Sequence, residues 1–444
     1  MSATLARVLP YAAQPAPAET YAQSGDPCLF RRARTWWTLA AICLIADGNG
    51  FLSKQDNTYY HRAVADEYAS DPMLRLITIA MYVICAGLIV GHIVPTLRAI
   101  LKQKPLLAVI GFAVVSTFWS QAPALTFKKA MMLSLIFAFA FFFADYYSPT
   151  DQRRMLLAAG TILAIASVVW VILLPSYGVA TSGEVIGEWK GVFGQKNDLG
   201  IAMFAFFSVL PFCPIPDRRR LFAVTFQAIL PLLLIVKAYS RESLVIFGLF
   251  VGVRVLGPAI ARKRREQLPF ILYTAVSGIV GVVLGWSIIL SLLGKGAVDS
   301  WSGRLHEWAP AVPYIFQHLW LGYGYGGFWT GEGDCLNVMR VLRVPMHGMD
   351  SGYVENMLEF GLVGMSIMLI VVLVTVRDFF MILRSRVVPL IAFWYVGFIL
   401  LTLVEGVVGY TFPVSGAPTF IFVVACCGLT QLSSDFLANR RSLK

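Results

Sequence analysis

The stretch MLLAAGTILAIASVVWVILLP (155–175) decides the fold, because it carries no charged residue over a length suited to crossing a bilayer. A helix of about 20 apolar residues spans a hydrocarbon core about 30 Å thick. Similar stretches recur along the 444 residues, of which 58% are hydrophobic and only 14% are charged. Soluble domains carry about 25% charged residues. The sequence therefore predicts an all-α polytopic membrane protein.

The apolar stretches predict about twelve transmembrane helices. They lack the period-two alternation of barrel strands, which argues against a closed barrel. A disordered cytoplasmic tail at 1–34 precedes transmembrane helices 1–9, which occupy 35–293. A large periplasmic loop (294–353) with an amphipathic helix follows, then helices 10–12 (354–430) and a cytoplasmic tail (431–444). The predicted spans are 35–53, 73–94, 105–120, 126–145, 155–175, 199–214, 220–237, 243–258, 269–293, 354–376, 387–404 and 410–430.

The distribution of basic residues predicts the orientation. The net charge is +11, and a cluster of Lys or Arg follows every even-numbered span. Basic residues concentrate in cytoplasmic loops. Both termini are therefore expected in the cytoplasm and the large loop in the periplasm, for a multi-pass protein of a bacterial inner membrane. The clusters form no continuous basic face, so we expect no nucleic-acid partner.

Two short outer segments carry candidate cations. In GVFGQKND (191–198), Lys196 and its amide neighbours precede a helix expected to start near Asp198. Such a helix N-terminus suits an anion, although an ordinary cap by Asn197 or Asp198 with a solvated lysine explains the pattern equally well. Arg241, in the turn AYSRES (238–243), lies between two apolar runs. A charge there has a ligand, pairs with Glu242, or snorkels to the interface.

The long loop combines an amphipathic pattern with many aromatic residues. SGRLHEWAPAVPYIFQH (302–318) has helical spacing of apolar residues, and Pro310 and Pro313 would kink or shorten the helix. The aromatic residues form either an interfacial belt or a platform for sugar rings. The four platform candidates are Trp308, Trp320, Tyr323 and Tyr325.

Further polar candidates follow at helix ends. His347 and Asp350 end the loop, and Glu355 is expected in the first turn of a membrane helix, where a carboxylate suits the dipole. Lys237 and Glu405 lie near outer helix ends, where they line a cavity or simply face the interface. No metal-ligand spacing, nucleotide-binding glycine pattern or disulfide framework is present. We therefore predict no metal and no cofactor.

The ordered set of motifs resembles the O-antigen ligase/polymerase superfamily, and within it the exopolysaccharide polymerases. The resemblance covers about 190–375, and the predicted topology is also similar to that family. The motifs are GVFGQKNDLG (191–200), the SRES turn at Arg241, SGRLHEW (302–308) with LGYGYGGFW (321–329), and DSGYVENMLEFGLVG (350–364).

The resemblance implies a metal-independent, inverting glycosyltransferase of the periplasmic face. Its donor would be an oligosaccharide on undecaprenyl diphosphate, and its acceptor a glycan or lipid A-core. Lys196, Arg241 and Arg304 match the family's basic positions and would bind the diphosphate. A polysaccharide chain-length regulator would be a partner.

One departure from the family concerns the general base. Ligases of the family often carry His-Asn where this chain has Asp350-Ser351. Asp350 or His347 would then be the base, with Arg304 as a further catalytic residue. Two readings compete with the polymerase: a lipopolysaccharide O-antigen ligase, and a secondary transporter or flippase without chemistry.

Overall fold

The computed structural model describes most of the membrane-embedded part of the chain. The described residues are 28–47, 72–180, 187–213, 221–240, 243, 246–248, 308–330, 333–342, 348–349, 351–385, 388–407, 409, 412–413 and 416–442.

These residues form helices and no strand; one isolated bridge joins Val179 and Trp189. Each predicted span overlaps a helix except 243–258 and 269–293, which lie largely outside the described residues. The elements are α1 (Cys28–Asp47), α3 (Pro72–Val90), α4 (Ile93–Lys102), α5 (Lys104–Val115), η3 (Ser116–Phe118), α6 (Pro123–Tyr146), α7 (Pro149–Leu173), α8 (Pro175–Gly178), α9 (Lys196–Phe207), η5 (Leu210–Phe212), α10 (Leu221–Lys237), α14 (Val312–Gln317), α15 (Asp334–Leu342), α16 (Gly352–Leu383), α17 (Leu390–Glu405) and α18 (Ala417–Ser442).

Four of these helices are long and apolar enough to cross a membrane by themselves: α6, α7, α16 and the apolar part of α18. A fifth span is possible if the bent pair α3 and α4 counts as one. Helices α5, α10 and α17 are apolar but shorter. The protein is therefore a multi-pass membrane protein, and the full count of twelve spans remains a prediction.

Capping residues fix where helices begin. Pro149 occupies the first turn of α7, and the Ser148 side chain accepts the Asp151 backbone N–H at 3.2 Å. Proline suits the first turn because its missing N–H would have no partner there. α6 likewise opens with Pro123. These local signals place the helix starts a few residues before the predicted apolar spans.

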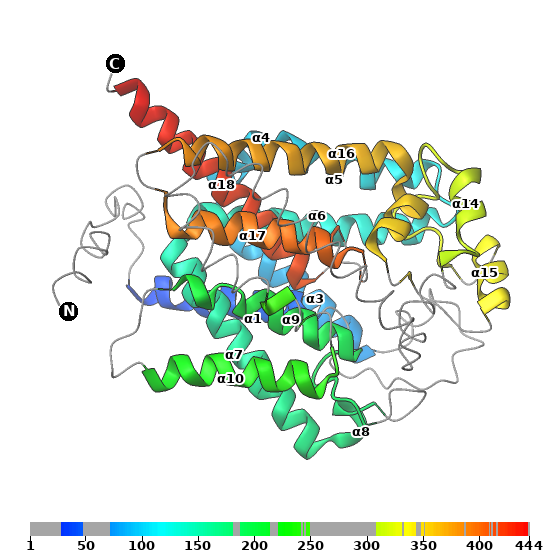
Figure 1. Ribbon diagram of the computed structural model, residues 1–444, viewed down its shortest axis with the longest axis horizontal. Helices are drawn as coiled ribbons and strands as arrows, with labels where there is room; N and C mark the ends of the chain where they lie inside the picture. Colours follow the sequence, from blue (N-terminus) through cyan, green and yellow to red (C-terminus); the bar gives the residue numbers. More distant parts are fainter. Residues whose placement is uncertain are drawn as a thin grey trace, which may run out of the picture.

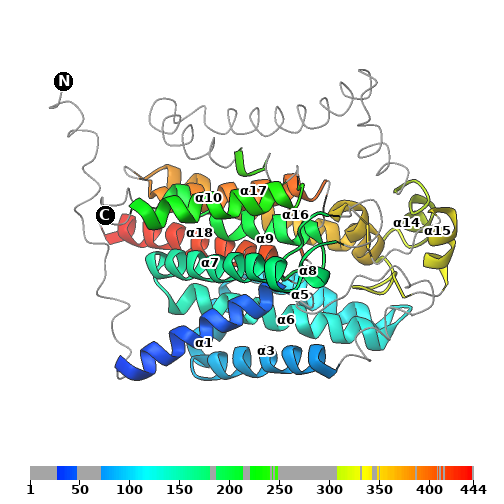
Figure 2. The ribbon, with the colours of Figure 1, turned by 90° about the horizontal axis from the view of Figure 1, so that it is seen from below.

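Helix α18 occupies the centre of the bundle. It packs against α17, α6 and α16, and also touches α9 and α1. Most long helices run along one axis, as Figures 1 and 2 show. Phenylalanines of α6 fill the space between them, with Phe139 stacked on Phe420 of α18 at 5.4 Å between ring centroids. Tight aromatic packing supplies stabilisation that lipid contacts alone do not give.

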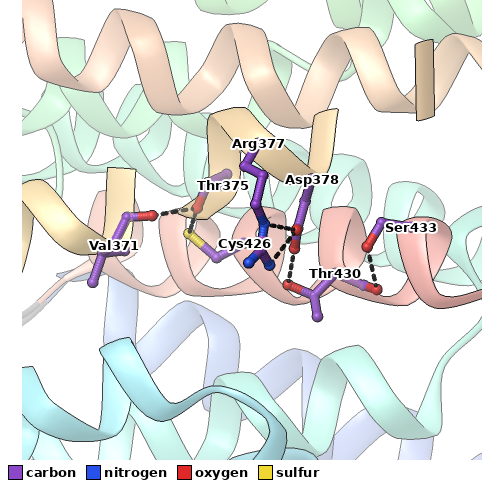
Figure 3. Close-up of polar contacts among 7 residues, drawn as sticks. All are labelled: Val371, Thr375, Arg377, Asp378, Cys426, Thr430 and Ser433. Carbon is purple, nitrogen blue, oxygen red and sulfur yellow. Dashed lines mark hydrogen bonds and ion pairs between the residues drawn. The ribbon is translucent and has the colours of Figure 1, made fainter. Parts of the chain in front are cut away.

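A buried carboxylate joins α16 to α18. Asp378 is fully buried; its Oδ1 accepts the Arg377 guanidinium at 2.8 Å, and its Oδ2 accepts the Thr430 hydroxyl at 2.9 Å (Figure 3). One turn earlier, the Thr375 hydroxyl lies 3.6 Å from the Cys426 sulfur. A buried charge is tolerated when it is paired and hydrogen-bonded. This contact fixes the second half of α16 against α18.

The predicted surface helix at 302–318 is short within the described residues. α14 begins only at Val312, after turns at Ala309 and Pro310. Residues 301–307 lie outside the described residues. Trp308 is helical, so the turns at 309–311 separate it from α14, and the length of the predicted helix stays a prediction.

Candidate functional site

The described parts of the predicted outer segments gather at one end of the molecule. Figure 1 shows α8, α14, α15 and the start of α16 at the end opposite to the start of α1 and the end of α18. Two polar centres lie there. One is built around lysines on the segments flanking α9, and the other around two glutamates of α16.

The first centre surrounds Lys196. Helix α9 begins at Lys196 with Gln195 as its N-cap, so it starts earlier than Asp198 and neither Asn197 nor Asp198 caps it. The Lys196 Nζ lies 2.5 Å from Glu188 Oε2, and the two side chains are 25% and 18% exposed. A cation in the first turn opposes the helix dipole. Glu188 offsets that cost, and the pair keeps some contact with solvent.

Two further lysines lie close to Glu188 in the chain or in space. Lys237, at the end of α10, places its ammonium 5.7 Å from the centroid of the Trp189 ring, and its carbonyl accepts the Trp189 N–H at 3.1 Å. Lys190 is buried, and burial lowers the pKa of its amine. We call Lys190, Lys196 and Lys237, with Glu188 and Trp189, the lysine cluster. It concentrates positive charge beside a helix N-terminus, which suits an anionic ligand.

The turn that carries Arg241 packs on the same helix. Ser240 and Ser243 are buried and share a hydrogen bond of 2.8 Å. A Cβ on Gly200 would lie 2.5 Å from the Ser240 hydroxyl, so only glycine allows this approach. Gly200 is one turn beyond Lys196. The motifs GQKNDLG and SRES are therefore in contact, while Arg241 itself lies outside the described residues.

The second centre is organised by a break in α16. Gly361 has φ 59° and ψ −165°, which interrupts the helix. At the break, two carbonyls and two N–H groups of α16 have no hydrogen-bond partner within the helix. Residues 319–324 of the loop form hydrogen bonds with all four. The Leu358 and Glu359 carbonyls accept from the N–H groups of 323 and 324, and the Leu362 and Val363 N–H groups donate to the carbonyls of 319 and 320. The distances are 2.7, 3.0, 2.8 and 3.0 Å in that order.

Glycines make this close approach possible. A Cβ on Gly322 would lie 2.5 Å from the Glu359 carbonyl oxygen, and one on Gly361 would lie 2.6 Å from the Trp320 carbonyl. Both residues also have positive φ, which side chains rarely adopt. The motifs LGYGYGGF and LEFGLVG are thus two halves of one backbone junction.

The junction encloses Glu355 and Glu359, which we call the carboxylate pair. They are 6% and 7% exposed, and the two carboxyl groups interact with one another. Glu355 Oε2 accepts the Trp329 indole N–H and the Met349 backbone N–H, both at 2.9 Å. Glu359 Oε1 accepts the Gly326 N–H at 2.8 Å.

Lys129 of α6 supplies the positive charge that faces this pair. Its ammonium acts electrostatically on both carboxylates and lies 3.5 Å from the Gly326 carbonyl. Sequence reasoning missed Lys129 and Glu359. Two glutamates four residues apart in an apolar run gave a usable signal for Glu359, because that spacing places both on one helix face. Nothing near Lys129 in the sequence indicated its partner.

The four predicted platform residues have different surroundings. Tyr323 is buried and donates its hydroxyl to Asp334 Oδ2 at 3.0 Å; burial and this carboxylate raise the Tyr323 pKa. Tyr325 is also buried, stacks on Phe360 and donates to the Pro413 carbonyl at 3.1 Å. Both tyrosines therefore support the loop from inside. Trp308 is half-buried and Trp320 is 68% exposed, so only these two present surface.

The remaining candidates, Arg304, His347 and Asp350, lie outside the described residues. The backbone on either side of Asp350 is anchored. The Met349 N–H donates to Glu355, and the Gly352 N–H donates to the Gly409 carbonyl at 2.7 Å. No group of three or more His, Cys, Asp and Glu residues in the described part of the chain is placed to hold a metal ion. The absence of a metal stays a prediction.

These features define the class of the protein: a helical multi-pass membrane protein with two polar centres at one end of the bundle. A family model described as O-antigen ligase matches residues 226–369, which includes the junction and the carboxylate pair. The exopolysaccharide production protein ExoQ of Rhizobium meliloti (strain 1021) is 23% identical over 286 residues. That alignment covers 60% of this chain and 62% of the relative, so the chain spans about three fifths of the length of the curated relative. Both comparisons support a relationship to the O-antigen ligase-like superfamily over these parts of the chain.

Proposed function

We propose that the protein is an inner-membrane glycosyltransferase that polymerises or ligates undecaprenyl-diphosphate-linked glycan on the periplasmic face. The observation that carries this proposal is the contact between the Lys196 helix and the SRES turn, in a chain related to the O-antigen ligase-like superfamily. In this proposal the chain crosses the inner membrane twelve times, both termini are cytoplasmic, and the two polar centres face the periplasm.

The donor is a lipid-linked oligosaccharide bound through its diphosphate. Phosphate oxygens bind ammonium and guanidinium groups strongly, and Lys196, Arg241 and Arg304 supply these groups. Lys196 is already paired with Glu188. Donor binding therefore exchanges one anion for another at Lys196, which makes Glu188 a competitor of the diphosphate.

The reaction is a metal-independent inverting transfer. An acceptor sugar hydroxyl attacks the anomeric carbon of the donor while the bond from that carbon to the diphosphate oxygen breaks. Asp350 or His347 takes the hydroxyl proton as general base. The lipid diphosphate leaves as an anion stabilised by the cations. Trp308 and Trp320 offer aromatic surface for the glycan, and Tyr323 and Tyr325 hold the loop that carries them.

The comparisons support two acceptors. The relative's name, an exopolysaccharide production protein, favours a growing glycan and hence a polymerase. The family description, O-antigen ligase, favours a ligase, for which we propose lipid A-core as the acceptor. We take polymerase as the first candidate and O-antigen ligase as the second. A chain-length regulator would act with the polymerase.

A transporter or flippase of the same lipid-linked glycan is the rival from another class. The test uses purified full-length protein, a lipid-linked oligosaccharide and a chelator, with no nucleotide. Longer lipid-linked chains support the polymerase, and product on added lipid A-core supports the ligase. Movement of lipid-linked glycan between leaflets of a proteoliposome, with no glycosidic product from any lipid-linked donor, would show that the rival is correct.

A further inference from the structure

Helix α4 turns sharply away from the direction of α3. The two helices meet at Gly91 and His92 with a bend of 92°. A helix at a right angle to a spanning helix does not continue its crossing. α4 therefore leaves the axis of α3 and lies across it.

The surface of α4 is divided into three stripes. Thr96 and Gln103 are buried against the bundle, where α4 packs on α6. Next around the helix come four exposed apolar side chains, which are 45–64% exposed: Ile93, Val94, Leu97 and Leu101. Arg98 and Lys102 are also exposed. Each lies about 100° further around the helix axis than the leucine before it, Leu97 or Leu101. Exposed apolar and basic stripes side by side are the pattern of a helix lying in a membrane interface.

Polar contacts among His92, Asp145, Arg34 and Tyr146, which we call the clasp, fix the bend between α3 and α4. The His92 Nε2 lies 3.1 Å from Asp145 Oδ2 at the end of α6. The Arg34 guanidinium of α1 donates to the Tyr146 hydroxyl at 2.9 Å. The Arg34 Nη2 atom lies 3.6 Å from the position that a Cβ on Gly91 would occupy. Contacts from α1 and α6 therefore hold α4 at its angle, so the helix is not loosely attached.

The level of the clasp coincides with markers of a membrane interface. Trp36 and Trp37, just after Arg34, are 69% and 56% exposed. Exposed tryptophans gather at the headgroup level of membrane proteins. The stretch GHIVPTLRAILKQK (91–104) contains no acidic residue and three basic ones besides His92. Arg34 of α1 lies beside Gly91 and adds a further positive charge. The surroundings of α4 thus favour negatively charged lipid.

We propose that α4 is an in-plane interfacial helix whose apolar stripe enters the bilayer and whose Arg98 and Lys102 bind the phosphates of anionic phospholipids. Lys104 extends the basic stripe beyond the helix. The occupant of this surface is bulk anionic lipid and not a protein. This proposal does not depend on the glycosyltransferase reaction, since α4 packs on α6, α5 and α3 and contains no residue of either polar centre.

The first test measures thermal unfolding of the full-length protein in detergent while phosphatidylglycerol or phosphatidylcholine is added. Phosphatidylglycerol should raise the unfolding midpoint at lower concentration than phosphatidylcholine. In R98Q/K102Q the concentration of phosphatidylglycerol that gives half the effect should rise about tenfold. The control R154Q/R340Q removes two other exposed charges and should behave like the wild type. Equal effects of the two lipids, or the same change in the control, would overturn the proposal.

The second test identifies the neighbour of the apolar stripe directly. Leu101, which is 64% exposed, is replaced by p-benzoylphenylalanine and irradiated in intact membranes. We expect lipid adducts, seen as a small increase in the intact mass of the protein. A protein adduct at Leu101 would show that α4 docks a polypeptide and would refute the lipid assignment.

Discussion

The lysine cluster and the carboxylate pair lie at the same end of the protein but are held in opposite ways. Lys196 is held by one partly exposed ion pair with Glu188. Glu355 and Glu359 are almost fully buried, and backbone or indole N–H groups bind both of them. A partly exposed ion pair contributes little stability and exchanges easily, whereas breaking a buried one is costly.

The contrast assigns different tasks to the two centres. The lysine cluster can release Glu188 and accept another anion without disturbing the fold. The carboxylate pair fixes the junction between the loop and α16, together with the backbone at Met349. Substitutions should therefore separate the two centres: changes at the first should alter activity, and changes at the second should alter stability.

The largest expected effect is at the junction. G361A forces a Cβ to 2.6 Å from the Trp320 carbonyl at a positive φ, so the loop and α16 can no longer pair. We expect a loss of about 3 kcal/mol or more in the free energy of unfolding, seen as a lower unfolding midpoint in detergent. The control is G111A, because a Cβ there meets nothing within 4 Å. Equal unfolding midpoints for G361A and G111A would show that the junction between the loop and α16 does not stabilise the fold.

The next effect is on the carboxylate pair itself. E359A leaves the buried Gly326 N–H without its acceptor and removes one of the two carboxylates on which Lys129 acts, and should cost about 3 kcal/mol. E355Q should cost much less than E355A, because an amide oxygen still accepts from Trp329 and Met349. The unfolding midpoints of the three variants, compared with that of the wild type, provide the measurement. A similar loss for E355Q and E355A would show that the charge, and not the hydrogen bonds, holds Met349.

At the lysine cluster we expect activity and stability to separate. K196Q should slow glycan transfer by about 100-fold while the unfolding midpoint stays close to that of the wild type. E188Q should keep the transfer activity and lower the KM for the lipid-linked donor, because it removes the competing anion. If E188Q is as inactive as K196Q, the ion pair is part of the chemistry and Glu188 is no competitor.

A smaller effect separates a glycan platform from an interfacial belt. Trp320 and Phe316 are each 68% exposed and lie on the same loop. If Trp320 stacks on sugar, W320A should raise the KM for the glycan by about tenfold, and F316A should leave it unchanged. Equal kinetic changes in the two variants would favour the belt.

The smallest effect concerns Lys190. Burial lowers the pKa of this amine, so the folded state binds its proton less readily than the unfolded state. The free energy of unfolding should therefore rise as pH increases from the lowered pKa towards the ordinary lysine value. Below the lowered pKa, the buried ammonium group should destabilise the folded state in full. K190M should remove this rise in the unfolding midpoint. An unchanged pH dependence in K190M would place its origin elsewhere.

Much of the helical fold was predictable from the sequence, because apolar runs of membrane length dominate it. Helices overlap the predicted spans throughout the described residues. Local chemistry explains the shifts at their ends. Helix α9 begins at Lys196 because Gln195 takes the extended cap conformation, which the expected caps Asn197 and Asp198 do not.

The site was only partly predictable. The short segments around Lys196 and Arg241 were both predicted on the outer face, and Gly200 with Ser240 shows that their motifs touch. The junction at Gly361 was not foreseen, because its hydrogen bonds join residues about 40 positions apart and helical periodicity continues across the break. Lys129 acts electrostatically on residues more than 200 positions away. Tyr323 and Tyr325 match an exposed aromatic loop by composition, but the backbone junction turns them inward.

The central claim is that the lysine cluster binds the donor diphosphate of a glycosyl transfer reaction. The most direct measurement is single-turnover transfer of labelled oligosaccharide from its lipid diphosphate by purified wild type, K196Q and G111A, with chelator and without nucleotide. The account predicts product from wild type and G111A at equal rates, and a rate about 100-fold lower in K196Q at an unchanged unfolding midpoint. Equal rates in wild type and K196Q would contradict it.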